Sequence, residues 1–241
     1  MILYPAIDIR DGRAVRLLRG EYASETRYDA DPVAAARRWS EGGARFLHVV
    51  DLDGAREGRP VNLGHVRRII DAVGVPVQVG GGLRDTAAIA EVLASGADRV
   101  VLGTAAQSDP ELVRVLVAEH GERIIASVDA RGGNVAISGW TRKTMTPAVE
   151  LVAELAERGV SRVVYTPVEV DGTLEGPALE GLRSLAATAR MELIYSGGIG
   201  SLDDLRALAG LELGNLGGAI VGRALYERRF TVAEGQAALG G

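Results

Sequence analysis

Short, largely apolar runs rich in β-branched residues alternate with longer amphipathic stretches along the whole chain. Most of the runs resemble Arg99-Val100-Val101-Leu102, a pattern typical of strands buried on both faces of a parallel sheet. The stretches between them repeat apolar residues every three or four positions, as in Val66, Ile69 and Val73, which indicates helices that bury one face. The pattern predicts eight strands, at residues 2–8, 45–51, 75–80, 98–103, 123–129, 161–166, 192–196 and 218–222.

Several of the predicted helices have clear start signals. Asp31-Pro32, Asp109-Pro110 and Thr146-Pro147 each place a capping side chain before a proline at the first helical position. Ser201 and Asp204 have the spacing of a capping box, with Asp in place of the usual Glu. Strand and helix therefore alternate in units of about 30 residues, which predicts a parallel sheet covered by helices.

Landmarks of the first half of the chain recur in the second half at nearly one spacing. The run that ends in Asp8 is matched by the run that ends in Asp129, 121 positions later. Three further pairs have offsets of 116, 118 and 119: Gly81-Gly82 with Gly197-Gly198, Asp53-Gly54 with Asp171-Gly172, and Gly103 with Gly222. A duplicated strand that ends in a duplicated acid indicates two similar halves around one site.

Eight repeated units in two matching halves predict an α/β protein with a closed sheet. We expect a single (βα)8 TIM barrel built from two half-barrels, about 1–121 and 122–241, in one domain of residues 1–241. The longest loops are predicted at 10–30 and 131–146, and long loops on this fold usually serve the active face.

Charge and composition exclude several classes of partner. The net charge is −5, and the 27 Lys and Arg residues are scattered, so the chain has no basic surface for nucleic acid or for an anionic membrane. It has no cysteine, which excludes disulfides and thiolate metal sites and fits a reducing compartment. No apolar run approaches the length of a membrane span, and charged residues follow the amino terminus too soon for a signal peptide. We expect a soluble, cytoplasmic monomer that binds a small molecule.

Two acids lie where this fold carries its chemistry. Asp8 and Asp129 end the first and fifth predicted strands, which lie opposite each other in an eight-stranded barrel. A pair so placed can divide the work of proton transfer, with one acid protonated and the other ionised. Either acid alone could instead be a helix cap or an ion-pair partner, and the duplication favours the catalytic interpretation.

Glycine clusters follow four other strands. Gly81-Gly82 and Gly197-Gly198 let backbone N–H groups approach an anion, and Gly103-Thr104 and Gly222-Arg223 precede predicted helix starts. Each half then has a phosphate site, which implies a ligand with a phosphate at both ends. The alternative is that these glycines only make tight turns.

The remaining candidates are weaker. Three dispersed histidines do not form a ligand trio, so we predict no metal site, and we interpret His48 as a core residue rather than a catalytic one. Trp140, in the long loop after the fifth strand, either stacks on a ring of the ligand or packs within the loop. Arg16 either clamps an anion or lies in solvent.

The motifs at the strand ends resemble those of a known family, and they occur in the same order along essentially the whole chain. The sequence is similar to the phosphoribosylformimino-5-aminoimidazole carboxamide ribotide isomerases of histidine biosynthesis. The matching segments are Pro5-Ala6-Ile7-Asp8, Asp11-Gly12, Ala14-Val15-Arg16-Leu17, the run from His48 to Gly54, Gly80-Gly81-Gly82-Leu83-Arg84, Leu102-Gly103-Thr104, Gly139-Trp140, Asp171-Gly172-Thr173-Leu174 and Ser196-Gly197-Gly198.

The resemblance implies a cofactor-free Amadori rearrangement, from an aminoaldose to an aminoketose, on a substrate that carries two phosphates (ProFAR to PRFAR). It implies that Asp8 accepts the proton and Asp129 donates one, with Asp171 as a rival donor. It also implies binding roles for the neighbouring side chains: Thr166 orients an acid or a sugar hydroxyl, Trp140 stacks on the aminoimidazole, and Arg16 steadies the phosphoribosyl end. Gly172 belongs to the same binding set.

Two departures from the family pattern leave alternatives open. Relatives usually have Thr-Asp or Thr-Glu after strand six, whereas Thr166-Pro167 stands here and puts the geometry of that loop in question. Bifunctional relatives that also isomerise phosphoribosylanthranilate have an arginine at the position of Ser138. The serine in this chain therefore favours the single activity. More distant alternatives are the cyclase subunit of imidazole glycerol phosphate synthase, a flavin oxidoreductase and a barrel that binds a phosphorylated metabolite without turnover.

Overall fold

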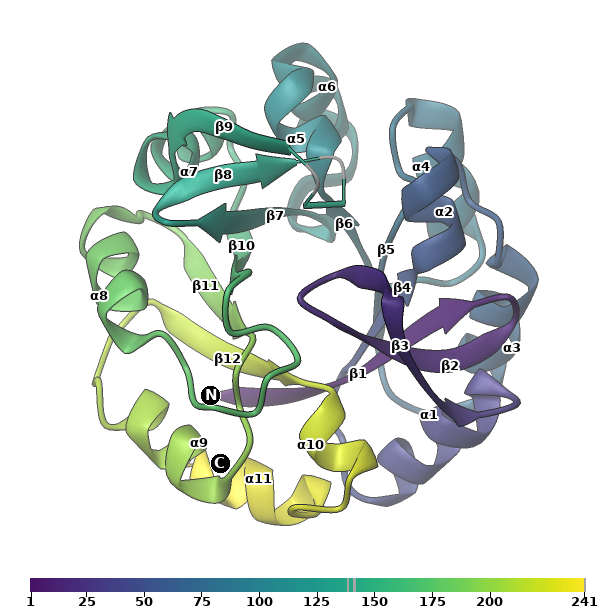
Figure 1. The fold of residues 1–241 in the computed structure, drawn as a ribbon. Helices are drawn as coiled ribbons and strands as arrows, with labels where there is room; N and C mark the ends of the chain where they lie inside the picture. The colour runs from purple at the N-terminus through teal and green to yellow at the C-terminus, as the bar shows by residue number, and fades with distance from the viewer. Residues whose placement is uncertain (138, 141, 241) are drawn as a thin grey trace.

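Eight parallel strands close into a barrel at the centre of the molecule (Figure 1). The computed structural model describes residues 1–137, 139–140 and 142–240. The sheet runs β1-β4-β5-β6-β7-β10-β11-β12 and returns to β1, so the predicted (βα)8 barrel is confirmed. Its strands are β1 (Ile2–Arg10), β4 (Leu47–Asp51), β5 (Val77–Gly80), β6 (Arg99–Leu102), β7 (Ile124–Arg131), β10 (Arg162–Pro167), β11 (Glu192–Ser196) and β12 (Leu216–Val221).

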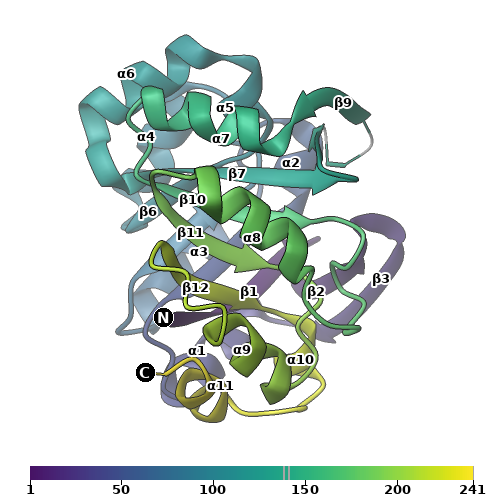
Figure 2. The same cartoon turned by 90° about the vertical axis from the view of Figure 1, so that its left-hand side faces the viewer.

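A ring of helices surrounds the barrel, one after each barrel strand (Figure 1), and Figure 2 shows some of them from the side. They are α1 (Pro32–Glu41), α3 (Leu63–Ala72), α4 (Thr86–Ala94), α6 (Pro110–His120), α7 (Ala148–Glu157), α8 (Leu179–Thr188), α9 (Leu202–Ala209) and α11 (Val232–Ala238). Shorter helices are inserted at α2 (Leu52–Glu57), η1 (Gly121–Arg123), α5 (Thr104–Ser108) and α10 (Arg223–Tyr226). Within the described ranges, no helix combines the length and apolar character that crossing a bilayer requires.

Most of the predicted helix starts are confirmed. Asp31 and Asp109 cap α1 and α6 through backbone N–H groups of the first turn, and Ser201 forms a capping box with Asp204 at α9. The prediction for Thr146 is wrong, because α7 begins at Ala148 without a side-chain cap. Thr146 belongs to a strand, where its own N–H is bonded to the Thr144 hydroxyl at 3.2 Å.

The two segments predicted as long loops are instead antiparallel hairpins, so that part of the prediction is wrong. Residues 10–30 contain β2 (Arg13–Leu18) and β3 (Glu21–Asp29), and residues 131–146 contain β8 (Asn134–Ile137) and most of β9 (Arg142–Pro147). The hairpins extend β1 and β7, which lie opposite each other in the barrel. Each half therefore places one hairpin beside the carboxyl ends of the strands (Figure 1).

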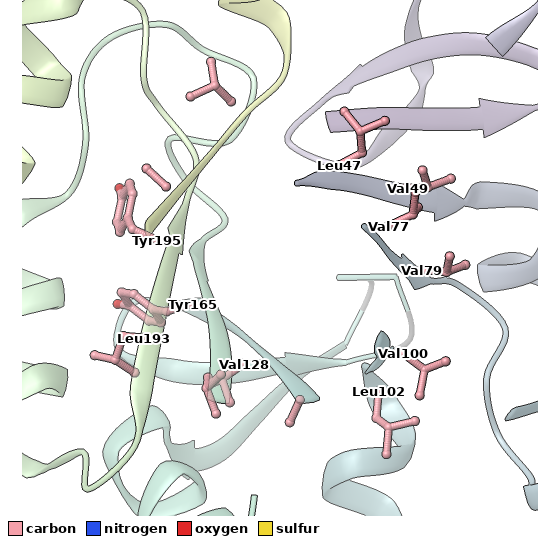
Figure 3. Packing of buried hydrophobic residues seen from close by; sticks show 14 of the residues in the cluster. Leu47, Val49, Val77, Val79, Val100, Leu102, Val128, Tyr165, Leu193 and Tyr195 are labelled. Carbon is pink, nitrogen blue, oxygen red and sulfur yellow. The ribbon is translucent and has the colours of Figure 1, made fainter. Parts of the chain in front are cut away.

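The apolar core has two layers. The larger layer lies between barrel and helices, and Figure 3 shows side chains such as Val49, Val79 and Leu102 pointing away from the barrel centre. The smaller layer fills the barrel interior, where the rings of Tyr4 and Phe46 have centroids 5.3 Å apart. Other members of this inner layer form the floor of a cavity at the carboxyl end: Ala6, Val101, Val164 and Ile220.

Candidate active site

A cavity of about 240 Å³ lies above this floor, at the carboxyl ends of the strands. Its lining includes the three candidate acids together with seven of the other predicted site residues: Asp8, Asp129, Asp171, Arg16, Gly81, Gly82, Gly103, Thr104, Trp140 and Thr166. A smaller recess shares Arg16 and Asp171 with the cavity and continues it towards β11 and β12. The structure therefore brings together residues that lie more than 160 positions apart in the sequence.

Asp8 on β1 forms an ion pair with Arg16 on the neighbouring strand β2. It lies near the end of β1, opposite Val15 of β2, and the next residue, Arg16, reaches back so that its Nη1 lies 2.9 Å from Asp8 Oδ1. The side chain of each partner is 11% exposed. Burial raises the pKa of Asp8, and the Arg16 guanidinium offsets part of that rise. The ion pair favours an ionised Asp8, the form that a base requires.

Asp129 has a different environment. Its Oδ1 accepts a hydrogen bond of 2.7 Å from the Ser127 hydroxyl, and its Oδ2 accepts one of 2.8 Å from the indole N–H of Trp140. Thr166, paired with Asp129 on the neighbouring strand, also hydrogen-bonds this carboxyl group. Burial raises the pKa of Asp129 and these three side chains oppose the rise, with no cation among the causes. Asp8 and Asp129 therefore have the contrasting surroundings expected of a base and an acid.

Asp171 lies in the loop after β10 and is buried in the same cavity. The net effect of its surroundings raises the pKa of Asp171 to about 6: burial is the main cause of the rise, Arg16 opposes it, and the carboxyl groups of Asp8 and Asp129 add to it. The equivalent residue of the first half, Asp53, has no such place in the lining. Its Oδ2 accepts hydrogen bonds from Asp11 N at 2.7 Å and Asn62 Nδ2 at 2.8 Å, so it anchors a loop.

The paired glycines have matching backbone conformations in the two halves. Gly81 and Gly197 have φ of 103° and 107°, and Gly82 and Gly198 have φ of 75° and 77°, a region that favours glycine. A Cβ at Gly82 would lie 2.6 Å from the carbonyl oxygen of Arg59, so the backbone itself requires glycine there. Backbone conformation and packing therefore require these glycines, and the same residues line the main cavity or the smaller recess.

Two glycine-lined recesses result, on opposite sides of the barrel. One lies after β5 and β6, where Gly81, Gly82, Gly103 and Thr104 line the main cavity. The other lies after β11 and β12 and is lined by the predicted residues Gly172, Gly197, Gly198, Gly222 and Arg223. Because β5 and β11 are four strands apart in a ring of eight, the recesses face each other across the acids.

Two cationic side chains lie at the second recess. The guanidinium carbon of Arg16 packs against Gly222, so the arginine touches both Asp8 and the recess. Arg223 is held by Gly172 O at 2.8 Å and by Glu227 Oε1 at 2.6 Å. Arg16 is therefore placed to interact electrostatically both with the Asp8 carboxylate and with an anion in the recess.

Trp140 connects the two hairpins over the mouth of the cavity. Its backbone has a φ of 68°, and its ring packs on Gly20, where a Cβ would lie 2.9 Å from Cζ3. The same indole donates to Asp129. Trp140 therefore lies within the site and holds one of its acids.

Other predictions from the sequence have mixed outcomes. His48 is buried and contacts Gln78 at 2.9 Å, as predicted for a core histidine, and it also lines the cavity. Pro167 is the last residue of β10, and Val168 N makes the next bond, to Ala130 O at 2.9 Å, so the proline ends the strand without disturbing it. Ser138, on which the distinction from bifunctional relatives rests, lies outside the described residues.

Some lining residues were not predicted at all. Ser127, Ser196, Tyr22 and Arg84 face the cavity. Ser127 could have been found, because it precedes Asp129 by two positions and residues i and i+2 of a strand share one face. Tyr22 enters through the hairpin that was predicted as a loop.

A closed (βα)8 barrel with carboxyl groups between two glycine-lined recesses at the carboxyl ends of its strands has the architecture of barrel enzymes. Residues 2–231 match the family model described as "Histidine biosynthesis protein". The chain belongs to this family.

Curated relatives match over nearly the full length. The chain is 51% identical over 234 residues to the 1-(5-phosphoribosyl)-5-((5-phosphoribosylamino)methylideneamino)imidazole-4-carboxamide isomerase of Moorella thermoacetica, covering 97% of this chain and 96% of the relative. It is 50% identical to the isomerase of the same name from Desulforudis audaxviator, covering 97% and 89%. It is 46% identical to that of Rippkaea orientalis, covering 100% and 93%.

Proposed function

We propose that this chain catalyses the reaction named for its relatives, the isomerisation of ProFAR to PRFAR in histidine biosynthesis. The name of that substrate contains two phosphoribosyl groups. The observation that carries the proposal is the set of three carboxyl groups, buried in Asp8 and Asp171 and half-buried in Asp129, between two facing glycine-lined recesses. A ligand with a phosphate at each end would span the recesses and place one sugar over the acids.

The reaction is an Amadori rearrangement, which moves protons and needs no external oxidant or reductant. A general acid protonates the ring oxygen of the aminoaldose, the bond from that oxygen to C1 breaks, and the nitrogen lone pair forms a Schiff base. A general base then removes the proton from C2, and the electron pair of that C–H bond forms the enolamine. Tautomerisation of the enolamine gives the aminoketose.

We assign the base to Asp8 and the acid to Asp129. Arg16 beside Asp8 favours its ionised form, whereas burial without a cation favours a protonated Asp129. Asp171 is the second candidate for the acid, because burial raises its pKa to about 6 and it lies in the same cavity. Thr166 orients Asp129, and Trp140 would exchange its bond to Asp129 for stacking on the imidazole ring.

The two phosphates would bind at the two recesses. Gly81, Gly82, Gly103 and Thr104 form the first site. The second site consists of Gly172, Gly197, Gly198, Gly222 and Arg223, with Arg16 between it and Asp8. Matched sites in matched halves support a chain built from two half-barrels in one domain.

Every acid and recess in this assignment comes from one chain, so we propose that the monomer is active. A histidine biosynthesis family and a sequence without cysteine support a cytoplasmic location. The proposed chemistry uses carboxyl groups alone and involves no cofactor, nucleic acid or membrane.

The direct test is to incubate the purified protein with ProFAR and to follow PRFAR formation. Turnover that Asp8→Asn abolishes, with substrate binding retained, is the expected result. No PRFAR formation by a folded, substrate-binding protein would contradict the proposal and favour a barrel that only binds a phosphorylated metabolite. Phosphoribosylanthranilate as a parallel substrate tests the bifunctional alternative.

A further inference from the structure

A histidine and a glutamine form a buried pair at the floor of the cavity. His48 on β4 is paired with Gln78 on β5, and the amide Nε2 of Gln78 lies 2.9 Å from the ring Nδ1 of His48. Gln78 is fully buried, whereas His48 is 8% exposed and lines the cavity. The rest of the proposed mechanism uses neither side chain.

The strand register places His48 diagonally below Asp8, on the next strand of the barrel. His48 is paired with Ala6 and Val50 with Asp8, so His48 lies one pleat deeper than Asp8 on the neighbouring strand. Side chains two residues apart in a strand face the same side, and here that side is the barrel interior. A ligand above the floor therefore meets the His48 ring next to Asp8.

The contact with Gln78 fixes which ring nitrogen carries the proton. An amide nitrogen only donates, so His48 Nδ1 must accept and the hydrogen of the neutral ring resides on Nε2. If the oxygen and nitrogen of the Gln78 amide were exchanged, Oε1 would face His48 and the buried Nε2 group would lose this hydrogen-bond partner. In the observed orientation the Gln78 side chain keeps its donor paired and leaves its Oε1 without a partner among the described residues, and an unpaired carbonyl oxygen is the less costly case.

The ring is also neutral. Burial, together with the positive charge of Arg16, lowers the pKa of His48 to about 3. Asp8 and Arg16 line the same cavity and are paired with each other, so neither stabilises an imidazolium. At neutral pH the ring is then not an acid or a base for proton transfer. It presents one N–H donor.

We propose that Gln78 is a positioning residue that holds His48 as the Nε2–H tautomer, and that His48 donates this hydrogen to the sugar of the bound substrate beside Asp8. The donor role rests on the proposed isomerase function, whereas the tautomer does not. A neutral donor suits this place, because it can bind a sugar hydroxyl without competing with Arg16 for the Asp8 carboxylate.

The tautomer is tested by NMR of protein labelled with ¹⁵N in histidine. The chain has three histidines, so His48→Phe and His120→Gln assign the signals. We expect His48 to show a protonated Nε2 and an unprotonated Nδ1 at pH 7. A protonated Nδ1, or an imidazolium at pH 7, would overturn the proposal. In Gln78→Met, which has similar volume but no donor, we expect the tautomers to mix.

The donor role is tested by a matched pair of variants. The amide nitrogen of glutamine reaches the position of Nε2, whereas that of asparagine reaches only the position of Nδ1. We expect His48→Gln to stay within about 10-fold of the wild-type kcat/KM, and His48→Asn and His48→Phe to lose about 10- to 100-fold. Equal activity in all three variants would overturn the donor role. If the wild type itself lacks isomerase activity, the function fails while the NMR result on the tautomer stands.

Discussion

Replacing Asp171 by asparagine should stabilise the protein above neutral pH. Burial raises the pKa of Asp171 from 3.8 to about 6, so the folded protein binds this proton more tightly than the unfolded chain does. This contribution to stability is complete at pH values below the pKa of the aspartate in the unfolded chain. It is lost as the pH rises through the pKa of Asp171 in the folded protein. A shift of about two pH units, at about 1.4 kcal/mol each, gives a loss of about 3 kcal/mol at pH 8 and about half of that at pH 5.

The measurement is thermal unfolding of wild type and Asp171→Asn at pH 5 and pH 8. For a chain of this length, about 3 kcal/mol corresponds to a rise in Tm of about 6 to 12 °C at pH 8, and the gap should shrink at pH 5. The asparagine side chain itself changes the stability by an amount that does not depend on pH. The informative quantity is therefore how the Tm difference between the variant and the wild type changes with pH. A gap that does not change with pH, or that favours the wild type more at pH 8, would refute the reasoning.

Asp53→Asn is the matched control, because Asp53 has the equivalent position in the other half. Its carboxylate accepts hydrogen bonds from Asp11 N and Asn62 Nδ2, so the amide should destabilise the protein by about 1 to 3 kcal/mol at pH 8. A rise in stability for Asp171→Asn and a fall for Asp53→Asn would show that the first aspartate has the environment of the site and the second a structural role.

Three further changes follow from the contacts of single residues. Trp140→Phe removes the N–H that stabilises ionised Asp129 in the free enzyme, so the alkaline limb of the kcat/KM profile should move to higher pH; an unchanged limb would exclude Asp129 as the acid. Gly198→Ala adds a Cβ at a φ of 77° against backbone and should raise KM at least about 10-fold, whereas Gly64→Ala, with open space around it, should leave KM unchanged. Asp51→Asn weakens four hydrogen bonds to one buried carboxylate and should cost about 2 to 4 kcal/mol in urea unfolding; a loss below 1 kcal/mol would mean that the loop is held elsewhere.

The barrel strands could be predicted from sequence because both of their faces are buried, which makes their apolar runs continuous. The hairpins could not, because they project from the barrel. In β3, for example, Glu21–Asp29 is polar along its length and mostly exposed or half-buried, so no apolar period marks it as a strand.

The candidate acids could be located from the sequence, but their individual roles could not. Asp53-Gly54 and Asp171-Gly172 are locally alike, and the difference arises from Asn62 and Asp11, which approach only Asp53 in the fold. His48 could be predicted to be buried, but its partner could not be. Gln78 is 30 positions away, and strand pairing brings its amide to His48 Nδ1.

The central claim is that two opposed carboxyl groups, located between the two phosphate sites, exchange protons with the substrate. The most direct test compares kcat and substrate affinity in Asp8→Asn and Asp129→Asn. We predict that each lowers kcat by about 100-fold or more while the dissociation constant of ProFAR changes by less than about 10-fold. A kcat close to that of the wild type, with the loss confined to substrate affinity, would contradict the claim.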